Sequence, residues 1–84
     1  MKGNIDLYRR LCRVIELEFP RVKSPITPET KASEVTGWDS LGHNRLIIAI
    51  EDEFKIKLPI AETLYITSVQ ALGELVIATC EKND

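Results

Sequence analysis

Residues 39–54 read DSLGHNRLIIAIEDEF, and this stretch decides the fold. Its large side chains recur at i, i+3, i+4, i+7 and i+11, which is the spacing of one face of an α-helix. That face consists of His43, Leu46, Ile47, Ile50 and Phe54. We predict a helix from about Leu41 to Phe54, capped by Asp39 or Ser40 and packed against a core through this face.

The same helix carries a second apolar pair on its far side. Leu41 and Ile48 are seven residues apart and lie among polar residues such as Asn44, Arg45 and Asp52. A helix in so small a bundle buries one face, so we expect both side chains to be at least partly exposed. Together with Asn44 and Arg45, Leu41 and Ile48 then form a candidate docking surface for a partner. The alternative is that a neighbouring loop folds over the two apolar residues.

The remaining sequence predicts three further helices and one long loop. Residues 4–19 have a helical period that ends at Pro20, and residues 20–37 form a loop that has room for one helical turn. A short helix is expected near residues 61–65, after Pro59. A closing helix starts at Thr67, with Gln70 completing a capping box. It is expected to bury Val69, Leu72, Leu75, Val76 and Thr79. The predicted fold class is all-α, a small four-helix bundle in which residues 1–84 form a single domain.

Composition excludes several classes of protein. The chain has 84 residues, 11 Lys and Arg, 13 Asp and Glu, and a net charge of −2, so it lacks the basic surplus of a nucleic-acid-binding protein. No apolar run approaches the ~20 residues of a membrane span, and the N-terminal residues lack the apolar core of a signal peptide. One histidine and two distant cysteines are too few for a zinc site. We expect a cytoplasmic monomer with reduced cysteines and no bound metal.

Ser40 stands where the long loop becomes the helix. The free N–H groups and the positive end of the helix dipole favour an anion such as a phosphodiester at this place. The alternative is that Ser40 only caps the helix. A catalytic Ser40–His43 pair is disfavoured, since Ser40 opens the helix while His43 lies on the core face, and no Gly-x-Ser-x-Gly motif is present.

Residues 39–54 resemble the signature of acyl carrier proteins, in which Asp-Ser-Leu opens a helix that ends in an acidic run and Phe. The resemblance extends over the whole chain, from the amphipathic first helix to the closing one. It implies a carrier and not an enzyme. It also implies that Ser40 receives 4′-phosphopantetheine from coenzyme A, with Asp39 helping to position a separate phosphopantetheinyl transferase. Acyl or aminoacyl cargo would then be held on the arm as a thioester and presented to partner enzymes.

The resemblance also implies further partners and a docking surface. A ligase that loads acyl or aminoacyl groups and enzymes that transfer or condense acyl groups are expected to dock through Leu41, Asn44, Arg45 and Ile48. Carriers of fatty acid synthesis usually have acidic residues where this chain has Gly42 and Arg45, and an apolar residue in place of Asn44. We therefore expect a specialised biosynthetic pathway. Two alternatives stay open: an unmodified helical interaction module with the carrier fold, and a D-alanyl or peptidyl carrier.

Overall fold

The computed structural model describes residues 2–82, with side chains from residue 5 onward. It contains helices α1 (Lys2–Glu18), α2 (Ser40–Phe54), α3 (Ile60–Thr63) and α4 (Val69–Lys82), and a 3₁₀ turn, η1 (Ala32–Glu34). Within this range no segment forms a strand, and one isolated bridge joins Lys31 to Ser68. The predicted all-α architecture is confirmed, and its long loop contains the single turn for which the sequence left room.

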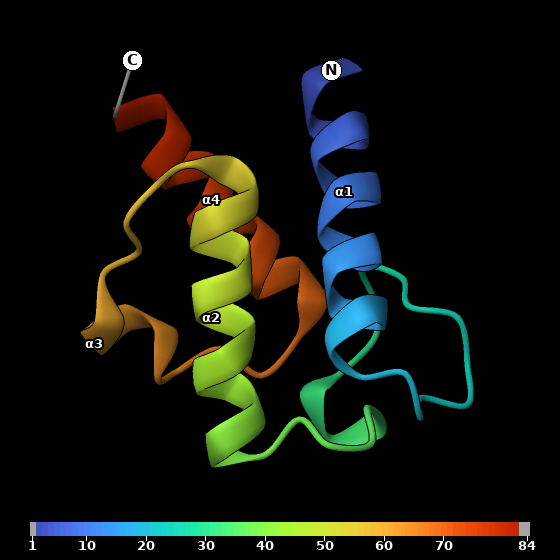
Figure 1. Ribbon diagram of the computed structural model, residues 1–84. Helices are drawn as coiled ribbons and strands as arrows, with labels where there is room; N and C mark the ends of the chain where they lie inside the picture. Colours follow the sequence, from blue (N-terminus) through green and yellow to red (C-terminus); the bar gives the residue numbers. More distant parts are fainter. Residues whose placement is uncertain (1, 83–84) are drawn as a thin grey trace.

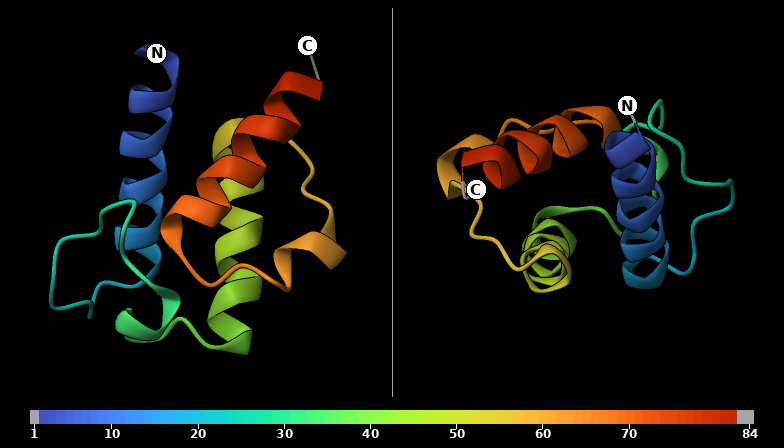
Figure 2. Two further views of the ribbon diagram at one scale, coloured as in Figure 1. Left: turned by 180° about the vertical axis from the view of Figure 1, so that it is seen from behind. Right: turned by 90° about the horizontal axis from the view of Figure 1, so that it is seen from above.

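Helices α1, α2 and α4 enclose the core, while α3 lies on the side of α2 opposite to α1 (Figures 1 and 2). The N-terminal end of α2 lies at one end of the bundle. The N-terminal end of α1 and the C-terminal end of α4 lie at the other end (Figure 1). The start of α2 is therefore remote from both of these helix ends.

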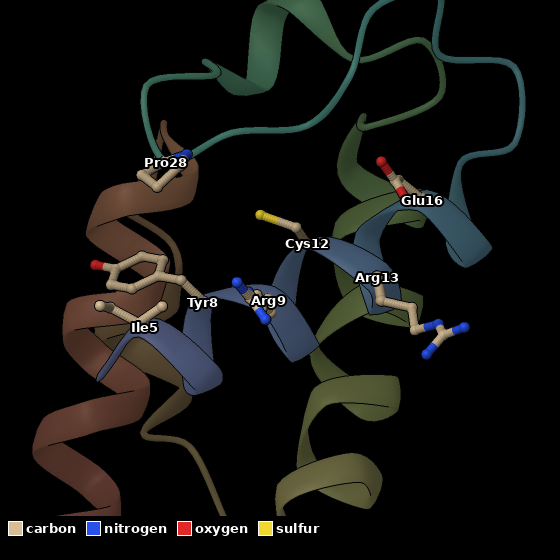
Figure 3. A pocket seen from close by; sticks show the side chains of 7 residues that line it. All are labelled: Ile5, Tyr8, Arg9, Cys12, Arg13, Glu16 and Pro28. Atoms are coloured by element: carbon tan, nitrogen blue, oxygen red, sulfur yellow. The ribbon is translucent and has the colours of Figure 1, made fainter. Parts of the chain in front are cut away.

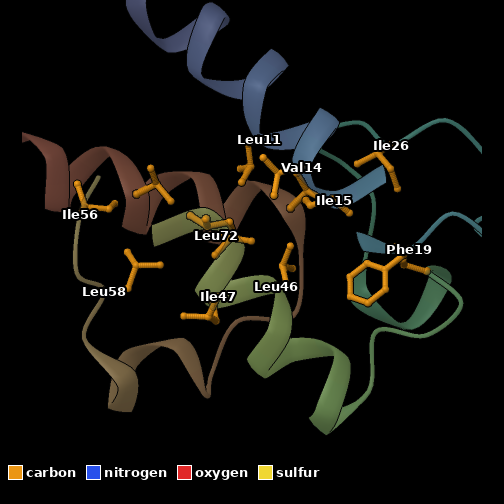
Figure 4. Packing of buried hydrophobic residues seen from close by; sticks show 14 residues of the cluster. Leu11, Val14, Ile15, Phe19, Ile26, Leu46, Ile47, Ile56, Leu58 and Leu72 are labelled. Carbon is orange, nitrogen blue, oxygen red and sulfur yellow. The ribbon is translucent and has the colours of Figure 1, made fainter. Parts of the chain in front are cut away.

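The core is built from aliphatic side chains of the three long helices and of the loops between them (Figure 4). From α2 it takes Leu46, Ile47 and Ile50, as the helical period predicts, whereas His43 and Phe54 of the same face are only half-buried. The other buried hydrophobic residues are Leu11, Val14, Ile15, Phe19, Ile26, Val35, Ile56, Leu58, Val69, Leu72 and Val76. Burying such side chains stabilises the fold by roughly 1.5–3 kcal/mol each before the entropy of ordering the chain is subtracted.

The long loop between α1 and α2 is held against the start of α4. The carbonyl groups of Thr30 and Pro28 accept hydrogen bonds from the backbone N–H groups of Val69 and Gln70, at 2.9 Å each. Ile26 and Val35 anchor the loop in the core. These contacts satisfy N–H groups that the first turn of a helix cannot satisfy itself.

Two details of the predicted helices are wrong. The closing helix starts at Val69, and the hydroxyl of Ser68, not that of Thr67, accepts the hydrogen bond from the N–H of Ala71 at 3.1 Å. Thr67 instead uses its carbonyl group to accept from Ala32 in the long loop. Leu75, which was expected to be buried, is half-buried and packs against the core. The short helix ends at Thr63, two residues before the predicted end. The first of these differences arises from contacts between the long loop and the start of α4.

Candidate functional site

Asp39 and Ser40 form the start of α2, the helix drawn in green in Figure 1. The carboxylate of Asp39 accepts a hydrogen bond of 2.9 Å from the N–H of Gly42, so Asp39 is the cap. Ser40 is the first residue of the helix, and its side chain is exposed. The hydroxyl of Ser40 therefore does not cap the helix, which was the alternative role considered for this residue.

The turn before α2 packs directly on the first turn of the helix. Gly37 adopts a positive φ of 96°, and its carbonyl group accepts from the N–H of Asp39. Gly42 is buried against this turn. A β-carbon at position 42 would collide with the Gly37 carbonyl oxygen and lie 2.8 Å from Cε1 of Phe19. There is thus a steric reason for glycine at a position where the fatty-acid carriers discussed above have an acid.

Trp38 and His43 form a polar pair next to Ser40. The indole Nε1 of Trp38 donates a hydrogen bond of 3.0 Å to Nδ1 of His43. The two rings are nearly parallel, with centroids 6.3 Å apart, and the Trp38 ring is also nearly parallel to that of Phe19, with centroids 5.9 Å apart. Trp38 therefore packs under the turn, and His43 is a half-buried neighbour of Ser40.

The hydrogen bond from Trp38 sets the tautomer of the neutral His43 ring. An indole N–H can only donate, so Nδ1 of His43 accepts, and in the neutral ring the proton is on Nε2. Nε2 is buried and has no hydrogen-bond partner among the described side and main chains. A buried donor without a partner costs about 1–3 kcal/mol. His43 thus carries a donor that the fold leaves unused.

A groove of about 400 Å³ lies beside Ser40. Trp38, Asp39, Ser40 and His43 line it from the turn and from α2. The remaining lining residues are Ala32, Asn44, Leu64 and Ile66. The groove therefore combines mainly apolar walls with the exposed hydroxyl of Ser40 and the ring of His43.

The second apolar face of α2 is exposed. Leu41 is 75% and Ile48 is 66% exposed, so the prediction of exposure is confirmed and the long loop does not cover them. Leu64 and Tyr65, just after α3, are 69% and 84% exposed. Sequence reasoning missed these two residues. The signal in the sequence was weak, because both residues lay within the short helix predicted near residues 61–65.

Charged residues of α2 divide into paired and unpaired groups. Arg10 of α1 forms an ion pair with Glu53 at 3.0 Å, and Lys55 pairs with Asp52 at 3.7 Å. Glu51 instead accepts from the N–H of Leu58. Arg45 and Asn44 are exposed, and among residues 5–82 no carboxylate forms an ion pair with Arg45.

A larger groove, of about 680 Å³, lies on the outer face of α1 (Figure 3). Its walls include Tyr8 and Cys12, and burial raises the pKa of both groups, with smaller contributions from the nearby Glu74 and Glu16 carboxylates respectively. Both cysteines are free thiols. Within residues 2–82 no group of three or more His, Cys, Asp and Glu is placed to hold a metal ion, and no helix there is long and apolar enough to span a bilayer.

Two comparisons with known proteins found acyl carrier proteins, as follows. No family model matches the chain. The chain is 33% identical over 66 residues to a putative mitochondrial acyl carrier protein of Schizosaccharomyces pombe. That alignment covers 76% of this chain and 58% of the relative, so the chain spans under two thirds of the relative's length. The solution structure of a holo acyl carrier protein from Geobacter metallireducens superposes with a TM-score of 0.78 and 29% identity, covering 90% of this chain and 87% of that one.

Proposed function

Because the chain belongs to the acyl carrier protein family, we propose that it is a carrier, and not an enzyme, whose attachment residue is Ser40. The observation that supports this most strongly is the exposed Ser40 hydroxyl at the first residue of α2, next to a cap supplied by Asp39. The free N–H groups of this first turn stabilise the negative charge of a phosphodiester. Asp39 is also the residue that we expect to help position the transferase.

The residues around Ser40 fit a 4′-phosphopantetheine group. The adjoining groove has mainly apolar walls, and Ser40, whose side chain is exposed, is one of the residues that line it. When bound, the group supplies a terminal thiol that carries acyl cargo as a thioester. The role of the chain's own residues is to present the Ser40 hydroxyl and to receive partners on exposed Leu41 and Ile48.

A mass measurement tests this proposal. We expect the protein to gain one phosphopantetheine unit on incubation with coenzyme A, magnesium and a phosphopantetheinyl transferase. Ser40→Ala removes the acceptor oxygen and should abolish the gain. Ser24→Ala is the matched control, because Ser24 is also exposed but lies in the long loop, and the mass gain of this variant should be unchanged. An unchanged mass of the wild-type protein with several transferases contradicts the proposal and favours an unmodified interaction module.

We further propose that the carrier serves a specialised pathway and not housekeeping fatty acid synthesis. The support is the exposed docking surface beside Ser40, where Asn44 and Arg45 stand in place of an apolar and an acidic residue. Condensing enzymes of fatty acid synthesis that present basic patches would meet the like charge of Arg45 there. The relative from Schizosaccharomyces pombe is named as mitochondrial, so a cytoplasmic location stays a prediction, as does the monomeric state.

The variant Arg45→Glu tests whether the charge of Arg45 disfavours the enzymes of fatty acid synthesis. A charge at the edge of an interface mainly changes the association rate and its salt dependence. We expect the variant to react faster than wild type with a fatty-acid condensing enzyme, and the advantage to shrink as salt is added. Arg9→Glu makes the same charge change on α1 and should have little effect. Equal rates for the wild type and Arg45→Glu would show that Arg45 does not select against fatty-acid condensing enzymes.

A further inference from the structure

The side chains of Trp38 and His43 form a bridge that spans Ser40. The indole Nε1 of Trp38 donates to Nδ1 of His43 at 3.0 Å, and Ser40 lies between the two residues in the chain. Asp39 closes the same span twice, since its carboxylate accepts from the N–H of Gly42 at 2.9 Å and its carbonyl group from the N–H of His43 at 2.7 Å. Contacts of the latter kind occur at any capped helix. The Trp38–His43 bridge is additional and depends on these two side chains.

The bridge is connected to the core through Phe19. The rings of Trp38 and Phe19 are nearly parallel, with an interplanar angle of 14° and centroids 5.9 Å apart. Phe19 is only 2% exposed and follows the last residue of α1. Its ring also lies so close to Gly37 and Gly42 that β-carbons there would be 3.3 and 2.8 Å from it. The bridge therefore ties the start of α2 to the body of the bundle as well as to the preceding turn.

His43 is not the residue that packing alone favours at this position. Its Nε2 is buried and has no hydrogen-bond partner in the part of the chain that the structure describes, although almost all buried polar groups in proteins have one. An apolar side chain would fill the space without an unsatisfied nitrogen. What histidine has and an apolar residue lacks is the acceptor Nδ1, which the bridge uses. The presence of histidine therefore indicates a role for the bridge beyond core packing.

We propose that the Trp38–His43 bridge holds the first turn of α2 in the conformation that a phosphopantetheinyl transferase recognises. Trp38 and His43 are then positioning residues for the modification of Ser40, a role that rests on the proposed function because it requires Ser40 to be the attachment residue. Helix ends fray, and an open first turn presents the hydroxyl in many orientations. In the transfer, the Ser40 oxygen bonds to the phosphorus that carries pantetheine in coenzyme A. The hydroxyl proton goes to a base of the transferase or to water, and adenosine bisphosphate leaves with the electrons of the broken P–O bond.

Loss of the bridge should change KM for the carrier and leave kcat unchanged. If the transferase binds only the ordered turn, its apparent KM rises in inverse proportion to the fraction of carrier that is ordered. Every bound carrier has the ordered turn, so kcat stays the same. A typical hydrogen bond shifts such an equilibrium by about two- to tenfold, and KM should rise by up to this factor.

Variants can remove the hydrogen bond from either side. Trp38→Phe keeps a ring that can pack on Phe19 but has no N–H donor, so its KM should rise. His43→Leu and His43→Asn are nearly equal in size, but only asparagine has an acceptor oxygen close to the position of Nδ1. We expect KM to rise in His43→Leu and to stay close to the wild-type value in His43→Asn. The double variant of Trp38→Phe and His43→Leu should be no worse than either single variant, because both remove the same hydrogen bond.

Stability and KM should change independently, which a merely structural role of the bridge would not allow. Arg10→Met removes the ion pair at the other end of α2 and should lower the free energy of unfolding without changing KM. The double variant removes both partners of the hydrogen bond and the unsatisfied Nε2, so its free energy of unfolding should equal or exceed that of the wild type. Its KM should nevertheless be raised.

Hydrogen exchange measured by nuclear magnetic resonance tests the bridge in the wild-type protein, whether or not a variant loses its fold. Trp38 is the only tryptophan, so its indole N–H gives a single signal. That N–H should exchange slowly with water, and it should exchange faster in His43→Leu, together with the backbone N–H of Gly42. Fast exchange of the indole N–H in the wild-type protein would overturn the inference.

Mass spectrometry of the wild-type protein distinguishes the two ways to fail. If it gains no phosphopantetheine unit with any transferase, the proposed function fails and this inference fails with it. If it gains the unit but KM is the same in the wild type, Trp38→Phe and His43→Leu, only the inference is overturned. An equal rise of KM in His43→Asn and His43→Leu would likewise overturn it, because the acceptor would then have no role.

Discussion

Gly42 sets how closely the turn before α2 can pack on the helix. It is buried, and the carbonyl group of Gly37 and the ring of Phe19 occupy the space that a side chain would need. The next two residues, Trp38 and Asp39, donate their backbone N–H groups to the carbonyl groups of Val35 and Gly37 within the same turn. A glycine in the first turn of a helix, which lowers helix propensity, is therefore used here to position the residues around Ser40.

We expect Gly42→Ala to destabilise the protein. Alanine gains about 1 kcal/mol of helix propensity. Forcing extra atoms into a packed site typically costs about 1–3 kcal/mol, and here one obstacle is backbone that cannot rotate away. The free energy of unfolding, measured with denaturant, should therefore fall. Asn44→Ala, at an exposed position two residues later, should change it by less than about 0.5 kcal/mol. A Gly42→Ala protein more stable than wild type would contradict this packing.

Single residues could be predicted from the sequence where the signal is local. The exposure of Ser40, Leu41 and Ile48 followed from their places on one helix, and Asp39 was one of two expected caps. The role of Glu51 could not be predicted in this way. Its carboxylate accepts from the N–H of Leu58, seven residues later, after Lys55 has ended α2 with a left-handed φ of 56°.

At the scale of elements, Arg10 joins α1 to the end of α2. Its guanidinium donates to the carboxylate and to the carbonyl oxygen of Glu53, at 3.0 Å each. It also lies 4.5 Å from the centre of the Phe54 ring. One side chain thus makes three contacts with the last turn of α2, which fixes the relation between the two helices at the end remote from Ser40.

Replacing Arg10 should weaken this connection. Arg10→Met keeps the apolar stem and removes the charge. Exposed ion pairs contribute about 0.2–1 kcal/mol, and a cation over an exposed aromatic ring contributes about 0.5–1 kcal/mol. We expect the free energy of unfolding to fall by a comparable amount at low salt and by less at high salt. Arg13→Met is the matched control on the same helix, and an equal loss in both variants would show that Arg10 has no special role.

The existence of each helix could be predicted, whereas its exact start could not. The period of apolar residues predicted α1, α2 and α4, because each helix buries one face. The start of α4 depends on the carbonyl groups of Thr30 and Pro28, which are some forty residues earlier in the chain. No pattern within the helix itself reports on such contacts, so Thr67 was preferred to Ser68 as the cap.

At the scale of the whole molecule, the ion pair between α1 and α2 and the candidate site lie at opposite ends of α2. Arg10 pairs with the last turn of α2, whereas Ser40, Leu41 and the groove lie at its N-terminal end (Figure 1). The net charge of the chain is only −2, which gives no strong overall field. We infer that partners are selected by local features such as Arg45 rather than by overall charge.

Peptide mapping of the protein purified from its own cells tests the central claim most directly. Trypsin cleaves after Lys31 and Arg45 and releases residues 32–45, which contain the hydroxyl groups of Ser33, Thr36 and Ser40. Fragmentation of this peptide locates any added group on one of them. The account predicts a phosphopantetheine unit on Ser40, and a peptide that is always unmodified, or modified at Ser33 or Thr36 instead, would contradict it.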